Sequence, residues 1–422
     1  MTSERDTPRE AYVWTWLPDR PDPVVAGRLA ATGLGLQFNY GRSWLERADR
    51  VPLYLPELPL QRGLLPLAGG LAMPGCLRDA APDAWGRRVI LNRLLGRAGR
   101  DADTAVLDEL GYLLASGSDR IGALDFQASA TEYVPREDEG SSLEALLDSA
   151  ERVERGESLP PALALALQHG TSIGGARPKA TLAGEGRRWI AKFSSSGDVQ
   201  PMVKLEFVAM RLAALAGLEV APVRLVQAGG REVLLVERFD RVRHADGRWR
   251  RRGMVSALTL LALDEMLAAY ASYEDLAEIV RHRFEQPRES LRELFGRLVF
   301  NILCGNTDDH ARNHAAFWDG ARLSLTPAYD ICPQARTGQE ATQAMKILGE
   351  QRFSRLDLCE AAAACFQLSS AQARGLIDAQ LQQVHVHWRA VCDEAGLGAA
   401  ERNALWGRQF LNPFALQGYP AT

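Results

Sequence analysis

The chain has 422 residues, of which 46% are hydrophobic and 24% are charged. This composition is typical of a folded protein, and it excludes a wholly disordered chain or a collagen-like repeat. A formal net charge of -4 excludes an overall basic field for nucleic acid. A polar N-terminus and the lack of any run of 18 apolar residues predict a soluble, cytoplasmic protein without signal peptide or membrane span.

Lysine is rare in this chain, since only four of its 49 basic residues are lysines: Lys179, Lys192, Lys204 and Lys346. Lysine carries a compact point charge and arginine a planar fork, so each remaining lysine is a candidate for a specific role. The six cysteines are scattered and contain no C-x-x-C pair. We interpret them as reduced thiols rather than a disulfide framework.

The first part of the chain mixes strands and helices. Short apolar pieces broken by proline and glycine predict a small β-meander over residues 11–40. Residues 76–115 are more helical, and Asp83 is placed to begin one of the helices. Residues 118–126 return to strand character, and an acidic stretch at 135–140 is typical of a solvated linker.

The middle of the chain predicts two hairpins separated by a helix. Residues 181–184 and 187–193 are expected to pair around a Gly-Glu-Gly turn. Pro201 begins a helix that Gly217 ends, and a second strand pair surrounds the glycines at 229–230.

From about residue 257 the pattern is mostly helical. Apolar residues with a 3.6-residue period follow Pro287, and Gly305 ends that helix. Residues 306–335 are irregular with short strands, and residues 355–410 are helical again. A strand-rich lobe followed by a helix-rich lobe predicts an α+β, bilobal architecture.

The sharpest chemical signal lies in the segment GNTDDHARN, residues 305–313. Asp308 and Asn313 have the interval found in the kinase catalytic loop, where the aspartate accepts the proton of the acceptor hydroxyl and the asparagine binds Mg²⁺. Asp330, after an apolar strand, would supply a second oxygen ligand for Mg²⁺. His310 is expected to brace this loop through hydrogen bonds and is counted with the nucleotide-binding residues.

A phosphotransferase also needs a positive charge for the nucleotide phosphates. Lys192 lies in an apolar strand, and Glu206 lies on the apolar face of the next helix. A carboxylate in such a place requires a partner, so we predict an ion pair between Lys192 and Glu206 like that of kinases.

A glycine-containing loop before this strand is the third element. Its backbone N–H groups are suited to binding phosphates, although a plain turn explains the same glycines and the loop does not match the Walker pattern. The elements follow the order found in kinases: loop, strand lysine, helix glutamate, aspartate, asparagine and second aspartate. This order is more specific for a kinase than any one of its members. The loop residues assigned to nucleotide binding are Ser172, Ile173, Gly174, Gly175, Ala176 and Lys179.

Other interpretations of these residues remain open. Asp308 and Asp309 are also suited to capping a turn. His310 and His314 have an i, i+4 spacing, but the run lacks the H-E-x-x-H glutamate of zinc enzymes. The basic run Arg241–Arg252 is interpreted as a solvated hairpin, with contact to nucleic acid or an acidic protein as the alternative.

Several motifs resemble the HipA family of serine/threonine kinases. They are SIGGARPK at 172–179, VERFDR at 236–241, GNTDDHARN at 305–313 and PAYD at 327–330, with PLYLP, DAWG and DRIGA in the N-terminal part. The resemblance covers nearly the whole chain. It implies a divergent kinase-like fold, with an N-terminal subdomain at 1–130, a nucleotide-binding part at 145–255 and a helical lobe at 256–422.

The resemblance also implies an activity and partners. Members are toxins of bacterial toxin–antitoxin pairs that use ATP and Mg²⁺ to phosphorylate proteins, for example an aminoacyl-tRNA synthetase. Asp308 would be the catalytic base, Asn313 and Asp330 the metal ligands, and Lys192 and Lys179 phosphate contacts. Ser172 matches a serine that members autophosphorylate to switch themselves off, which adds about −1.5 to −2 charge beside the nucleotide.

The partner implied is a small helix-turn-helix antitoxin, through which contact with DNA would be indirect. Two other functions remain open at this point. One is a catalytically inactive corepressor with a kinase fold, and the other is a kinase for a small molecule.

Overall fold

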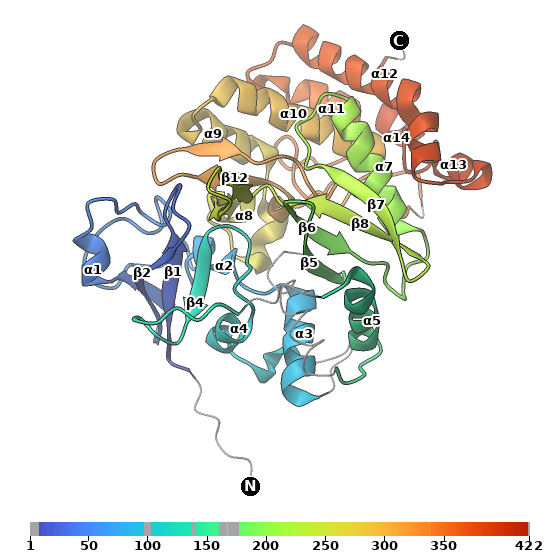
Figure 1. Ribbon diagram of the computed structural model, residues 1–422. Helices are drawn as coiled ribbons and strands as arrows, with labels where there is room; N and C mark the ends of the chain where they lie inside the picture. Colours follow the sequence, from blue (N-terminus) through green and yellow to red (C-terminus); the bar gives the residue numbers. More distant parts are fainter. Residues whose placement is uncertain are drawn as a thin grey trace. The chain divides into compact units, whose positions relative to one another are not determined.

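The computed structural model describes residues 8–96, 103–136, 141–159, 167, 177–336 and 338–420. The chain forms two compact units. The first comprises Met1–Asp198, Val226–Val255 and Phe317–Ala321, and the second comprises Val199–Leu225, Ser256–Ala316 and Arg322–Thr422. Their elements are labelled in Figure 1.

The predicted β-meander is present at the start of the first unit. Strands β1 (Glu10–Trp16), β2 (Pro23–Thr32) and β3 (Gly35–Tyr40) are antiparallel neighbours. A fourth strand, β4 (Leu124–Gln127), pairs with β1 (Figure 1), which gives the order β3-β2-β1-β4. The strand predicted from residue 118 therefore begins later, at residue 124.

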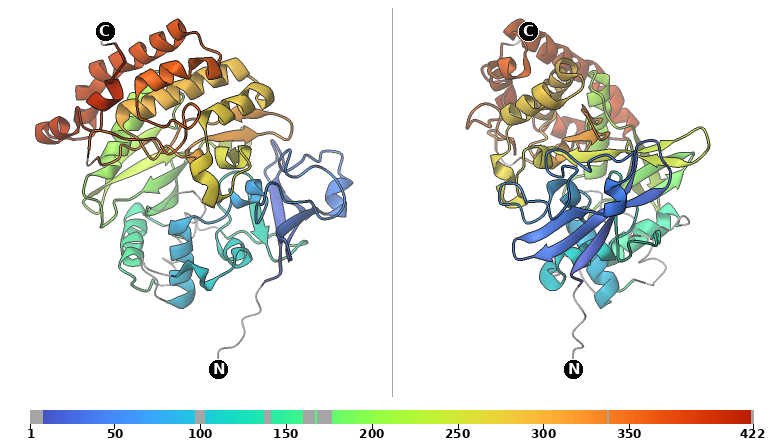
Figure 2. Two further views of the ribbon diagram at one scale, coloured as in Figure 1. Left: turned by 180° about the vertical axis from the view of Figure 1, so that it is seen from behind. Right: turned by 90° about the vertical axis from the view of Figure 1, so that its left-hand side faces the viewer.

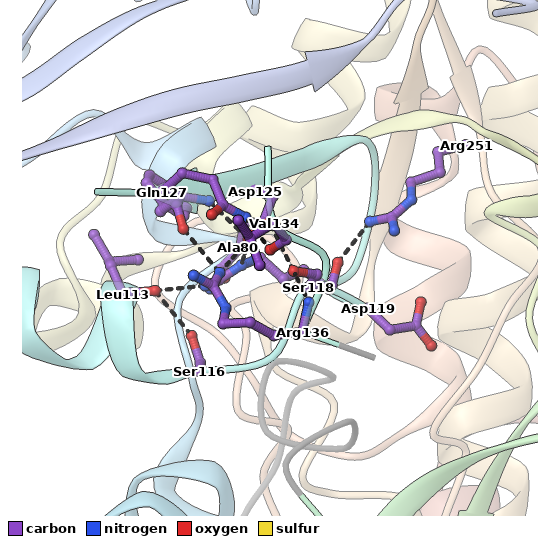
Figure 3. A network of polar contacts seen from close by, with 12 residues as sticks. Ala80, Leu113, Ser116, Ser118, Asp119, Asp125, Gln127, Val134, Arg136 and Arg251 are labelled. Carbon is purple, nitrogen blue, oxygen red and sulfur yellow. Dashed lines mark hydrogen bonds and ion pairs between the residues drawn. The ribbon is translucent and has the colours of Figure 1, made fainter. Parts of the chain in front are cut away.

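A buried polar network fixes β4 in place. The fully buried Arg120 donates from Nε to Asp125 Oδ1 at 2.9 Å and from Nη1 to the Ala80 carbonyl at 2.9 Å. Asp125 also accepts from Ser118 Oγ at 2.7 Å and from Arg136 at 2.8 Å (Figure 3). Because these donors and acceptors meet one another, burial of the charges is compensated.

The first unit also contains short helices. The structure has α1 (Arg42–Leu45), α2 (Gly75–Arg78), α3 (Ala84–Leu95), η1 (Thr104–Val106), α4 (Glu109–Ala115) and α5 (Leu143–Glu154). As predicted, Asp83 begins a helix, since its side chain accepts from the Gly86 N–H at 2.6 Å. Ser142 caps α5 in the same way.

The two predicted hairpins form one sheet of order β5-β6-β8-β7. Its strands are β5 (Lys179–Gly184), β6 (Arg187–Lys192), β7 (Val223–Ala228) and β8 (Arg231–Glu237). Glu185 and Gly186 both have positive φ, as a two-residue turn between twisted strands requires. Trp189 and Ala191 point into a core shared with Trp85 and Leu146, so α3 and α5 cover this sheet within the first unit.

The basic run forms the predicted hairpin, with β9 (Arg241–Arg243) and β10 (Trp249–Arg251) in antiparallel register. The prediction that it is solvated was wrong for three of its arginines. Arg241, Arg250 and Arg251 are buried, and each has internal acceptors. Arg251 also lies over the Trp16 ring, 3.6 Å from its centroid. Residues 242–248 and Arg252 are exposed.

The second unit is mostly helical, as predicted (Figure 2). Its helices are α7 (Met202–Leu215), α8 (Ala257–Leu260), η2 (Glu265–Tyr270), α9 (Tyr273–Arg283), α10 (Pro287–Cys304), η3 (Ala311–Asn313), α11 (Leu356–Ala361), η4 (Ala363–Phe366), α12 (Ser370–Glu394), α13 (Ala399–Leu405) and α14 (Pro413–Leu416). Helix α12 packs against α7, and α10 packs against α9.

A three-stranded sheet, of order β11-β12-β13, completes the described elements. Its strands are β11 (Gly253–Ser256), β12 (Ala315–Trp318) and β13 (Leu323–Leu325). Strand β12 follows the segment 305–313 after one residue, and β13 leads to Asp330. None of the helices in the described part of the chain is long and apolar enough to span a membrane.

Candidate active site

The catalytic-loop segment begins with a sharp exit from α10. Gly305 has φ of +70°, and a Cβ at this position would lie 2.5 Å from the Gln409 carbonyl oxygen. Glycine is therefore required both by the backbone conformation and by the close approach of another segment. The next residue, Asn306, is buried and donates from Nδ2 to Asn301 Oδ1 at 3.0 Å. These contacts fix the direction in which the loop leaves the helix.

Asp309 anchors the loop from inside the second unit. Its buried carboxylate is 2.8 Å from His314 Nε2, and it also accepts from the Tyr273 hydroxyl at the start of α9. Tyr273 and His314 also contact each other, with 3.1 Å between the hydroxyl and Nε2. Asp309 is thus a structural residue, and His314 Nε2 is engaged by its carboxylate.

Asp308, next to this anchor, is exposed. Its backbone carbonyl accepts from Asn313 Nδ2 at 3.1 Å, and the Asn313 N–H donates to the His310 carbonyl at 2.8 Å. Because Nδ2 of Asn313 donates to the loop, the remaining polar atom of its side-chain amide is the oxygen Oδ1. The structure therefore brings Asp308, His310 and Asn313 into one compact turn.

Asp330 lies close enough to affect Asp308. Loss of hydration in the loop raises the pKa of Asp308, and the neighbouring Asp330 and Asp309 carboxylates raise it further, while His310 lowers it. Asp330 has φ of +58°, an uncommon conformation for a residue with a side chain. The pair predicted to surround a metal, Asn313 and Asp330, is thus assembled around Asp308.

The segment after Asp330 is attached to the same loop. The Gln334 N–H donates to the Gly305 carbonyl at 3.0 Å, and the Ala344 N–H donates to the Thr307 carbonyl at 3.1 Å. Gln343 Nε2 donates to the Asn306 carbonyl at 3.0 Å. Gln334, Gln343 and Ala344 therefore attach this segment by hydrogen bonds to residues 305–307, which directly precede Asp308.

His310 carries an unused polar atom. Its backbone takes part in the turn, but its Nδ1 is buried and has no hydrogen-bond partner in the described part of the chain. Side-chain bracing by His310, which the sequence predicted, is not seen. A buried polar atom without a partner is uncommon in a protein interior, and a bound water, ion or ligand is one explanation for it.

Lys192 and Glu206 are found on the predicted elements. Lys192 is half-buried at the end of β6, on the face opposite to the core residues Trp189 and Ala191. Glu206 is buried on α7. The two residues belong to different units, and the ion pair between them stays a prediction.

Lys179 has a partner that the sequence did not indicate. It lies directly opposite Lys192 on the neighbouring strand, and its buried Nζ is 2.7 Å from Asp83 Oδ2. Like charges on facing positions destabilise a sheet, and the Asp83 carboxylate compensates one of them. Among the remaining nucleotide-loop residues, Ser172, Ile173, Gly174, Gly175 and Ala176 lie outside the described residues.

Two further residues of the site were not singled out from the sequence for these roles. Tyr273 is 36 positions from Asp309, and the sequence around it indicates only the start of a capped helix. The sequence around Asp83 likewise indicates a helix start and not the partner of a lysine 96 positions later. No local pattern connects residues so far apart.

The fold and this loop define a class of protein. The chain is α+β, and helix α10 ends at a glycine. An aspartate follows, with an asparagine five positions later and a second aspartate beside them. This spacing is that of the catalytic loop of protein kinases. Two family models match the chain, the HipA N-terminal domain over residues 21–127 and the HipA-like C-terminal domain over residues 171–388. The chain belongs to the HipA family.

Individual relatives agree with this assignment. The chain is 29% identical over 349 residues to Y4mE of Sinorhizobium fredii, which is named as a putative kinase, with 77% of each chain covered. It is 29% identical over 184 residues to the serine/threonine-protein kinase toxin HipA of Shewanella oneidensis, covering 38% of this chain and 42% of the toxin.

A solved structure shows the same fold. The structure of the HipA, HipB and operator DNA complex from Shewanella oneidensis contains a chain that matches with a TM-score of 0.67 at 20% identity. The match covers 94% of this chain and 96% of that one. The predicted α+β, kinase-like fold is confirmed by this likeness.

Proposed function

We propose that this chain is an ATP- and Mg²⁺-dependent serine/threonine protein kinase that acts as the toxin of a toxin–antitoxin pair. The observation that carries the proposal is that two adjacent aspartates differ in burial and in contacts. Asp309 is buried and holds the loop, while Asp308 is exposed, has a raised pKa and lies beside Asn313 and Asp330. A purely structural loop does not need two such groups beside one exposed carboxylate.

In this proposal Asp308 orients the acceptor hydroxyl and accepts its proton as the phosphoryl group is transferred. The carbonyl oxygen of Asn313 and the carboxylate of Asp330 would hold Mg²⁺, and both are the hard oxygen ligands that this ion prefers. The unpartnered Nδ1 of His310 supports a ligand at this place, since no described residue satisfies it. Mg²⁺ bound here would neutralise charge on the nucleotide phosphates.

The remaining predicted residues serve the nucleotide. Lys192, held in position by Glu206, would bind phosphates, and Lys179 with the loop of Ser172, Ile173, Gly174, Gly175 and Ala176 would line the same site. Lys179 is held in place by its ion pair with Asp83. Phosphorylation of Ser172 would place a negative charge in that loop and switch the enzyme off.

The partner and the target come from the family. The HipA of Shewanella oneidensis was solved with HipB and operator DNA, which supports a HipB-like, DNA-binding antitoxin as a partner of this chain. A cellular protein, for example an aminoacyl-tRNA synthetase, would be the target. Contact with DNA would be made through the antitoxin.

The experiment is intact-mass measurement of the purified full chain before and after incubation with ATP and Mg²⁺. We expect a gain of one phosphate that maps to Ser172 in the wild type, or a phosphate already present at the start, and none in Asp308→Ala. Glu132→Ala, which removes an exposed carboxylate elsewhere, should behave as wild type. An unphosphorylated wild type that neither gains phosphate nor binds ATP would contradict the proposal and favour the inactive corepressor. ATP turnover without phosphorylation of any protein would favour the small-molecule kinase.

A further inference from the structure

Arg336 lies within the segment 331–344 that is attached to the catalytic loop. Its side chain is buried, with 7% of the residue exposed. One nitrogen, Nη2, donates to the Gln339 carbonyl at 2.9 Å. The other two, Nε and Nη1, are buried and have no hydrogen-bond partner in the described part of the chain. A permanently charged group is thus held out of water with most of its donors unused.

Among the described residues, six other arginines also have a buried nitrogen without a hydrogen-bond partner, and four of them differ from Arg336 in one respect. Each of these four forms an ion pair with a carboxylate: Arg136 with Asp125, Arg250 with Asp246, Arg281 with Glu278 and Arg297 with Glu293. No ion pair of Arg336 occurs among the described residues. Burial lowers the pKa of Arg336, and it is the one cause of that shift.

A second arginine lies beside the first. Arg408 is exposed, and its Nη2 is 3.4 Å from the Arg336 carbonyl oxygen. The ion pairs of the described residues do not include Arg408 either. The neighbouring Gln409 is the residue whose carbonyl approaches Gly305 so closely. Two arginines that no described carboxylate pairs with are therefore located next to the start of the catalytic loop.

We propose that Arg336, with Arg408 beside it, is a binding site for a terminal phosphate group. A buried cation without a carboxylate is stabilised by an external anion, and the guanidinium suits phosphate because it offers several N–H donors to several oxygens. The choice of phosphate among anions rests on the proposed function. The group bound is either the terminal phosphate of a nucleotide or the phosphate of a phosphorylated serine or threonine side chain.

The test is direct binding of inorganic phosphate to the full chain, measured by calorimetry at constant ionic strength without ATP. The wild type and Arg389→Gln, which removes an arginine from α12, should bind phosphate equally. Arg336→Gln should weaken binding at least about tenfold, and Arg408→Gln should weaken it less. Equal binding by wild type and Arg336→Gln, or no binding by the wild type at millimolar phosphate, would overturn the proposal.

Two additions keep the result interpretable. If Arg336→Gln does not fold, Arg336→Lys retains the charge without the fork and should still show the loss. Competition between phosphate and ATP would identify the nucleotide as the source, and simultaneous binding of both would identify a phosphorylated side chain. Phosphate binding by a chain that transfers no phosphoryl group would contradict the kinase proposal and leave this site standing.

Discussion

The guanidinium of Arg238 lies 2.8 Å from the carboxylate of Asp119, although 119 positions separate them in the chain. Arg241 pairs with the same carboxylate at 2.9 Å, and both arginines also pair with Asp240. The Gly122 N–H donates to Asp240 at 2.8 Å. The motifs DRIGA and VERFDR, which are far apart in the sequence, thus form one buried ion cluster within the first unit.

The charges of this cluster depend on one another. Burial alone would raise the pKa of Asp119, but four arginines, led by Arg238, hold it well below its usual range. Burial and the neighbouring Arg238 lower the pKa of Arg241 to about 10, which leaves it charged at neutral pH. Removal of one partner therefore leaves an uncompensated charge in the interior.

Asp119→Asn should lower the free energy of unfolding by about 3–5 kcal/mol, the usual result of breaking a buried ion pair from one side. Urea unfolding of the full chain, followed by tryptophan fluorescence, measures this change. The control is Asp22→Asn, because the exposed pair of Asp22 with Arg248 should contribute little. An equal loss in both variants would show that burial of the cluster is not what makes it important.

Asp308→Asn and Asp309→Asn should fail in different ways, although the residues are adjacent. Asp308→Asn should remove phosphoryl transfer and leave the fold intact, because its carboxylate is exposed. Asp309→Asn should lower the stability by about 2 kcal/mol or more, because its buried carboxylate binds Tyr273 and His314. Thermal unfolding and a radiolabelled ATP assay on both variants separate the two roles. Normal stability in Asp309→Asn would contradict the anchoring role.

Asp308 should also make stability depend on pH. Because the folded state raises its pKa above 3.8, the folded chain binds this proton more tightly than the unfolded chain. Stability is therefore lost as the pH rises from 3.8 through the raised pKa. Asp308→Asn lacks this loss, so it should be more stable than wild type at pH 7 and no more stable below pH 3.8. Unfolding curves at several pH values test the sign, and a variant less stable at pH 7 would contradict it.

Gly305→Ala and Gly407→Ala form a matched pair. Both glycines have φ near +70°, but an added Cβ meets the Gln409 carbonyl oxygen at 2.5 Å only at Gly305, while nothing described lies within 4 Å at Gly407. The backbone conformation alone costs roughly 1–2 kcal/mol for a residue with a side chain. Gly305→Ala should lose clearly more than Gly407→Ala in chemical unfolding. Equal losses would mean that the close contact has no consequence.

Elements set by local rules could be predicted from the sequence. The turn at Glu185 and Gly186, the helix that Gly305 ends and the interval between Asp308 and Asn313 each depend on residues close together in the chain. Backbone conformation and hydrogen bonding within a few residues determine such features. Local sequence patterns were therefore sufficient to predict the helix end at Gly305 and the turn that contains Asp308 and Asn313.

The pairing of charges could be seen only once the chain is folded. Asp83 pairs with Lys179, and Asp119 pairs with Arg238 and Arg241 across more than 90 positions. The prediction of a solvated basic hairpin was wrong for Arg241, Arg250 and Arg251 for the same reason, since their acceptors include carbonyl groups at residues 122, 19 and 118. Arg336 is the opposite case, a buried cation that no carboxylate of the described residues pairs with. Whether a charge is paired depends on distant groups brought together by packing, and sequence spacing carries no information about that.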